Sequence, residues 1–128
     1  MLKAVLIDGS ALSRGLLNTV MIDGGYDVVG QTHTTAQGFA LIQKFQPQIV
    51  CIALDQVEDG SNTVEQIREH YPKTLILMVS GAIDAPTLKK ALARGISGFI
   101  VKPFKADAVL NAIRNAVLAM IKKQQAPS

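Results

Sequence analysis

Three polar residues follow short apolar runs of the sequence, and together they could hold a phosphoryl group. Asp8, Ser80 and Lys102 each come directly after such a run. A carboxylate can bind a metal ion, a hydroxyl can donate a hydrogen bond to an oxyanion, and an ammonium group neutralises phosphoryl charge. Each residue alone is most simply a solvated loop residue. All three together, at the ends of predicted strands, favour a phosphate-handling site.

The runs that position these residues alternate with helical patterns. They span residues 3–7, 28–31, 49–54, 75–79 and 98–101. The run 49–54 is apolar without polar alternation, which is typical of a central parallel strand covered on both faces. Five β-α units predict an α/β fold, a doubly wound sheet of five parallel strands with helices on both faces.

The intervening helices are marked by caps and apolar stripes. Thr34 or Thr35 and Asp84 are placed to cap two helices, and Asn62 with Glu65 has the spacing of a capping box. The last helix begins at Ala106; we expect the domain to span residues 1–122 and a disordered tail to follow over 123–128. The expected inward residues include Leu12, Leu16 and Val20; Phe39, Ile42 and Phe45; Leu88, Ala91 and Leu92; and Val109, Leu110, Ile113, Val117, Met120 and Ile121.

Composition restricts the class of protein. A chain of 128 residues that is 48 % hydrophobic is expected to form one globular domain. Its single cysteine, Cys51, excludes an intrachain disulfide and a thiolate zinc cluster, and we expect a buried, inert thiol in a cytoplasmic protein. No apolar run approaches the roughly 18 residues of a membrane span, and the opening residues do not form a signal peptide.

The charge is unevenly distributed. Residues 1–86 contain nine acids and five bases, a net charge of −4, and residues 87–128 contain one acid and eight bases, a net charge of +7. Without interleaved aromatic residues, these bases are better explained as solvated helix faces than as a nucleic-acid site.

Five stretches resemble the response-regulator receiver domain, the flavodoxin-like module that accepts phosphate from a histidine kinase. They are residues 5–14, 25–30, 47–52, 77–81 and 95–104. The resemblance implies a flavodoxin-like (βα)5 three-layer sandwich without enzymatic activity of its own. It also implies that Ser80 is the switch hydroxyl, Phe99 the switch aromatic and Lys102 the contact to the phosphoryl oxygen, before a cis bond to Pro103.

The acidic residues depart from the family pattern. Asp8 matches the first member of the acidic pair, but the second member, a direct magnesium ligand, is Gly9 here. The phosphoacceptor normally lies six residues after a proline, and six residues after Pro47 is Ala53. Because Mg²⁺ requires near-octahedral oxygen ligands, Asp8 and Asp55 would form at best a weak metal site. We therefore expect no bound cofactor.

Asp55 is the only nearby candidate acceptor, although it is eight residues after Pro47 and five before Gly60. If the strand stays extended, Asp55 shares a face with Ala53 and lies one pleat further out, about 6–7 Å along the strand. Its carboxylate could alternatively face Lys102.

Three functions follow from these residues. The leading hypothesis is an atypical receiver that has lost ordinary phosphorylation and acts by docking to a protein. The second is a phosphorylatable receiver that uses Asp55 and Mg²⁺. The third is a flavodoxin-like cofactor-binding domain, for which residues 9–13 form only a thin phosphate loop.

The resemblance also implies a docking face for a kinase, an output domain or a second receiver, including a homodimer. This face consists of the helix after Asp84, the strand 98–101 and the last helix. We expect Lys89, Lys90 and Lys105 to form a basic patch around Phe99 that binds an acidic protein surface.

Overall fold

The structure, a computed structural model, describes residues 1–125. In this part of the chain the predicted strands are confirmed to within one residue at each end, and one short helix, α3, has no predicted counterpart. The elements are β1 (Lys3–Ile7), α1 (Ala11–Asp23), β2 (Asp27–Thr32), α2 (Thr35–Phe45), β3 (Ile49–Ala53), α3 (Leu54–Val57), α4 (Thr63–His70), β4 (Leu75–Ser80), α5 (Ala85–Arg94), β5 (Gly98–Val101) and α6 (Ala106–Gln125).

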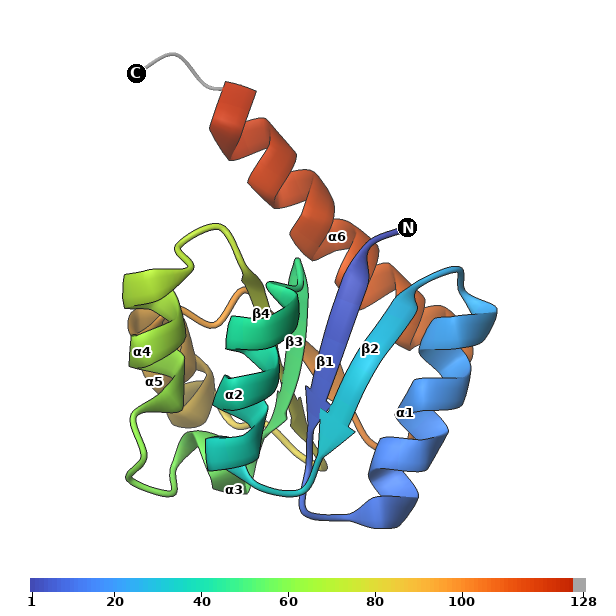
Figure 1. Ribbon diagram of the computed structural model, residues 1–128, viewed down its shortest axis with the longest axis horizontal. Helices are drawn as coiled ribbons and strands as arrows, with labels where there is room; N and C mark the ends of the chain where they lie inside the picture. The colour runs from blue at the N-terminus through green and yellow to red at the C-terminus, as the bar shows by residue number, and fades with distance from the viewer. Residues whose placement is uncertain (126–128) are drawn as a thin grey trace.

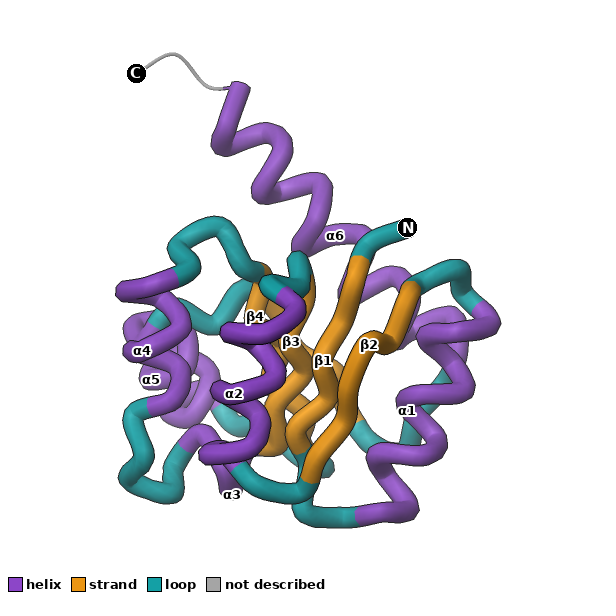
Figure 2. The backbone as a smooth tube through the Cα atoms, in the orientation of Figure 1, coloured by secondary structure: helices purple, strands orange, loops and turns teal. Residues whose placement is uncertain are grey.

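The strands form one parallel sheet in the order β2-β1-β3-β4-β5 (Figure 2). β3 is the central strand, as its unbroken apolar run predicts, and every residue of β3 and β4 is buried. Because all strands are parallel, the loops that follow them meet at one edge of the sheet. That edge is where the candidate site must lie.

Helices cover both faces of the sheet and form a three-layer sandwich (Figure 1). Cys51 of β3 packs in a core cluster with residues of α1 and α6. Its neighbour Ile52 points the other way, into a cluster with residues of α2, α3, α4 and α5. This alternation follows from the two-residue period of a strand. The predicted flavodoxin-like architecture is confirmed.

Two predicted helix caps are present and the predicted capping box is wrong. The side chains of Thr34 and Asp84 accept hydrogen bonds from backbone N–H groups three residues further on. Asn62 instead has a φ of 57°, in the left-handed region, and its side chain makes no capping bond. Glu65 is engaged by Arg94, whose Nη2 donates to Glu65 Oε1 over 2.8 Å.

Several predicted inward residues are exposed. In α1 the fully buried residues are Leu17 and Met21, one position beyond the predicted stripe, while Val20 of that stripe is partly buried against the same core cluster. Two adjacent stripes with i, i+4 spacing exist in this helix, so periodicity alone does not choose between them. The predicted core residues found exposed are Leu12, Leu16, Leu92 and Ile121, at 74, 51, 53 and 44 % of their surface.

α6 is the longest helix, and its last turns extend beyond the sheet (Figure 1). The helix continues through Gln125, so residues 123–125 of the predicted disordered tail are helical, and the domain boundary at residue 122 stays a prediction. Lysine and glutamine are good helix formers, which accounts for the extension. Residues 126–128 of the predicted tail lie outside the described residues.

Candidate functional site

Asp8, Ser80 and Lys102 lie together at the carboxyl edge of the sheet. The ammonium Nζ of Lys102 is 3.7 Å from Asp8 Oδ2. The backbone N–H of Lys102 donates to the carbonyl of Ser80 over 2.9 Å. Parallel strand ends therefore bring residues 22 to 94 positions apart in the sequence into one pocket, as the sequence predicts.

Asp8 is held from two sides. It is 7 % exposed, and its Oδ1 accepts a hydrogen bond from the backbone N–H of Ser10 over 2.9 Å. Its other carboxylate oxygen faces Lys102. A buried carboxylate requires such partners because water no longer solvates its charge. The Asp8 charge is therefore balanced within the chain.

Ser80 and Pro103 complete the pocket. Ser80 is 7 % exposed, and its hydroxyl donates to the carbonyl of Ala82 over 2.9 Å. This bond directs the hydroxyl toward the loop that follows β4. The bond between Lys102 and Pro103 is cis, the isomer that the resemblance implies.

Ala53 and Asp55 lie on different elements. Ala53 is the last residue of β3 and is 3 % exposed, and the chain turns into α3 at Leu54. Asp55 is an exposed residue in the first turn of α3. The expectation that an extended strand presents Asp55 one pleat beyond Ala53 is wrong, because the strand ends. Within residues 1–125, the acid paired with Lys102 is Asp8, and Asp55 forms no ion pair.

The residues around Asp8 do not fit a magnesium ion. A side chain could be accommodated at Gly9, because a Cβ there would meet no atom closer than Gln56 Nε2, at 3.9 Å. Gly9 and Ala53 nevertheless supply no carboxylate. Nowhere in the described part of the chain do three Asp, Glu, His or Cys side chains gather as metal ligands. Mg²⁺ binding by carboxylates thus lacks its donor set here.

Comparison with known proteins identifies the family of this chain. The family profile of the response regulator receiver domain matches residues 4–114. The chain belongs to this family. The receiver is 28 % identical over 117 residues to the chemotaxis protein CheY of Listeria monocytogenes, an alignment that covers 91 % of this chain and 98 % of CheY.

Solved structures share the fold. The signal receiver domain of NarL from Mycobacterium tuberculosis has a TM-score of 0.81 at 21 % identity, covering 91 % of the receiver and 96 % of that domain. NtrX from Brucella abortus has a TM-score of 0.84 at 23 % identity, covering 97 % of the receiver but 29 % of NtrX. The same fold thus occurs both as an isolated domain and within a longer chain.

The family assignment removes support for the flavin-binding alternative. Residues 9–13, which resemble a phosphate-binding loop only weakly, contain the N-cap residue of α1. The Ser10 side chain accepts a hydrogen bond from the backbone N–H of Ser13 over 3.2 Å and caps α1.

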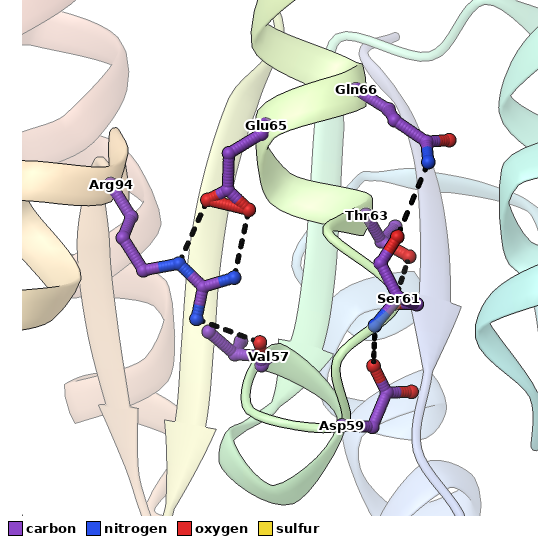
Figure 3. A network of polar contacts seen from close by, with 7 residues as sticks. All are labelled: Val57, Asp59, Ser61, Thr63, Glu65, Gln66 and Arg94. Carbon is purple, nitrogen blue, oxygen red and sulfur yellow. Dashed lines mark hydrogen bonds and ion pairs between the residues drawn. The ribbon is translucent and has the colours of Figure 1, made fainter.

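A polar network that joins α3, α4 and α5 was not predicted from the sequence (Figure 3). Arg94 of α5 binds the Glu65 carboxylate through Nε and Nη2, at 2.8 Å each, and donates from Nη1 to the carbonyl of Val57. Arg94 lowers the pKa of Glu65 by hydrogen bonding. The bonds connect α3, α4 and α5 of the receiver. Partners 29 and 37 residues apart leave no local sequence signal.

The residues of the predicted basic patch lie on α5, on β5 and just before α6. Phe99 is half-buried and packs on the core cluster of the α2–α5 face, and Lys89 and Lys105 are exposed. Lys90 lines a hollow of about 260 Å³ on the α3 side of α5, together with Val57. A single patch around Phe99 therefore stays a prediction. The sequence analysis missed two exposed apolar residues on these elements, Leu92 and Val101, each 53 % exposed.

The remaining reactive side chains do not join the site. Cys51 is buried in β3, and burial raises the pKa of its thiol to about 12, in keeping with an inert group.

None of the helices in residues 1–125 has the length and hydropathy of a transmembrane segment.

Proposed function

We propose that this receiver works in two-component signalling as a docking module that has lost ordinary aspartyl phosphorylation and has no catalytic activity of its own. The observation that carries the proposal is the pair of Asp8 with Lys102, beside an alanine at the end of β3. The lysine expected to meet a phosphoryl oxygen faces a carboxylate of the chain instead. Phosphoryl transfer depends on positioning and charge neutralisation, and without the two family carboxylates an incoming phosphoryl group would meet only Lys102.

The alternative acceptor, Asp55, is not favoured by its position. It is exposed on α3, whereas Asp8 and Lys102 lie within the pocket. A phosphoryl group on Asp55 would need a metal ion or an ammonium group beside it. Within residues 1–125, no basic side chain lies within 4 Å of its carboxylate.

The proposed partner is a protein, namely a kinase, an output domain or a second receiver, including a second copy of this chain. Exposed Leu92 on α5 and Val101 on β5 support docking through the surface of α5, β5 and α6. Lys89, Lys90 and Lys105 would favour an acidic partner. Nucleic acid and membrane are not the proposed partners, and the reducing cytoplasm, which suits a chain with one cysteine, is the proposed compartment.

The test is phosphorylation with acetyl phosphate and Mg²⁺, followed by intact-mass spectrometry. We expect no added phosphoryl group in the wild type and one in a variant with Gly9→Asp and Ala53→Asp, which restores the family carboxylates. A wild-type protein that gains a phosphoryl group, and loses this ability in Asp55→Asn, would refute the proposal and establish Asp55 as the acceptor.

The docking face has its own test. We expect Lys89→Glu with Lys90→Glu to weaken binding to a purified cognate kinase or second receiver at least tenfold at low salt, with a smaller difference at 1 M salt. A matched pair, Lys3→Glu with Lys44→Glu, makes the same change in net charge on β1 and α2, away from this face. Equal binding by both pairs would exclude this face.

A further inference from the structure

Three hollows join at the amino edge of the sheet, opposite the pocket of Asp8. Their volumes are about 300, 400 and 350 Å³. Leu75 and Met120 line both the 400 Å³ hollow and the 350 Å³ hollow. The 300 Å³ hollow shares Pro72 with the first of these and Lys73 with the second. Because they share lining residues, the three hollows adjoin one another, and we call them together the basal groove.

The end of α6 forms one wall of the basal groove. The last turns of this helix extend past the starts of the strands (Figure 1). Val117 and Met120 are only partly buried and Ile121 is 44 % exposed, and all three line the groove. Leu2 and Leu75 of the sheet edge contribute further apolar surface. The groove therefore has apolar walls that no described element covers.

The basal groove carries positive charge without compensating acids. Arg68, Lys73 and Lys123 line it, and no Asp or Glu among residues 1–125 does so. The Arg68 guanidinium donates to the carbonyl of Gly95 over 2.7 Å and to the hydroxyl of Ser97 over 2.8 Å, which fixes its position but leaves its charge unbalanced. None of the three bases forms an ion pair within the described residues.

We infer that the basal groove is a second docking surface, which binds an amphipathic peptide segment with apolar side chains flanked by carboxylates. Apolar contacts with Leu75, Val117 and Met120 would supply binding free energy by removing apolar surface from water. Carboxylates on the same segment would meet Lys73 and Lys123 at the rim. The groove lies at the other edge of the sheet from Asp8 and Lys102, so this inference is independent of the phosphorylation state.

The test is a titration of the isotopically labelled full chain, followed by amide chemical shifts. The probe is a synthetic helical peptide with leucines at i, i+3, i+4 and i+7 and glutamates elsewhere, and its control has lysine in place of glutamate. We expect the glutamate peptide to shift the amides of Leu75, Val117 and Met120, and to bind at least tenfold more tightly than the lysine peptide.

Two double variants separate the groove from general charge attraction. Lys73→Glu with Lys123→Glu should weaken binding of the glutamate peptide at least tenfold. Lys44→Glu with Lys122→Glu has the same change in net charge, but neither residue lines the groove, and binding should be retained. Both variants should keep the wild-type spectrum away from the substitutions.

Three results would overturn the inference. They are shifts centred elsewhere on the chain, equal binding of the two peptides, and equal loss in the two double variants. Concentration-dependent shifts of the same amides without peptide, together with a dimer in sedimentation velocity that the peptide does not dissociate, would assign the groove to a second copy of the chain instead.

Discussion

Restoring the family carboxylates with Gly9→Asp and Ala53→Asp should destabilise the metal-free protein. β1 and β3 are neighbouring strands whose last pair in register is Ile7 with Ile52, so the next residues, Asp8 and Ala53, follow side by side. Neighbouring strands are about 4.8 Å apart. A new carboxylate at residue 53 would therefore lie close to that of Asp8, in a buried position.

The size of the effect follows from this spacing. Two unit charges about 5 Å apart repel by roughly 3 kcal/mol at an effective dielectric constant of about 20. In the double variant the carboxylates of residues 8, 9 and 53 repel one another in three pairs. The two new carboxylates also each attract Lys102. With interactions of equal size, two of the three repulsions are offset, and a net repulsion of roughly 3 kcal/mol remains. At about 4 °C per kcal/mol, the Tm should fall by roughly 10 °C.

Magnesium should reverse this loss in the double variant alone. At a concentration 100 times its Kd, a bound ion stabilises the folded state by about 2.7 kcal/mol. Thermal melts with and without MgCl₂ measure this, and Gly9→Asn with Ala53→Asn is the uncharged control, expected not to respond. A charged double variant whose Tm is the same with and without Mg²⁺ would refute the placement of residues 9 and 53 in the pocket.

Three further perturbations test other parts of the structure. Glu65→Gln should lower the free energy of unfolding by about 0.5–1 kcal/mol at pH 7, because it breaks the partly exposed ion pair with Arg94. Folding lowers the pKa of Glu65 below 4.5. Urea titrations should therefore show the difference between wild type and variant shrinking as the pH falls through this lowered pKa. Gly38→Ala should cost about 1–3 kcal/mol in the same assay, since its Cβ would overlap the buried side chain of Ile7, and an unchanged midpoint would contradict that contact. Cys51 should resist iodoacetamide in the native protein at pH 8 and react after denaturation; rapid native labelling would contradict its burial.

The sequence predicts the sheet well because its signal is local. Apolar runs without alternation identify β3 and β4, and side chains such as Asp8 and Lys102 at strand ends then fall at one edge by topology alone. The position of Asp55 could not be obtained in this way. Ala53 and Leu54 are both apolar and carry no capping signal, so the change from strand to helix between them depends on tertiary packing.

The Arg94 network could not be predicted for a related reason. Arg94, Glu65 and Val57 are brought together by packing of α5 against α3 and α4, over separations of 29 and 37 residues. Taken alone, each residue is typical of a solvated helix surface. Long-range polar contacts of this kind become visible only when the helices are placed.

If this receiver has lost phosphorylation, as we propose, it needs another source of free energy to change conformation. Ser80 donates its hydroxyl to Ala82, and Lys102 faces Asp8, so both polar groups of the switch have partners inside the chain. A ligand shifts an equilibrium only by its difference in affinity for the two states. To move a population from 1:99 to 99:1, a docking partner must bind one state about 10⁴-fold more tightly, or by about 5.5 kcal/mol. If Phe99 is the switch aromatic, as the resemblance implies, a partner on α5, β5 and α6 would gain that difference from contacts around Phe99. Substitutions of these contact residues should then alter the response to the partner more than the stability of the free chain.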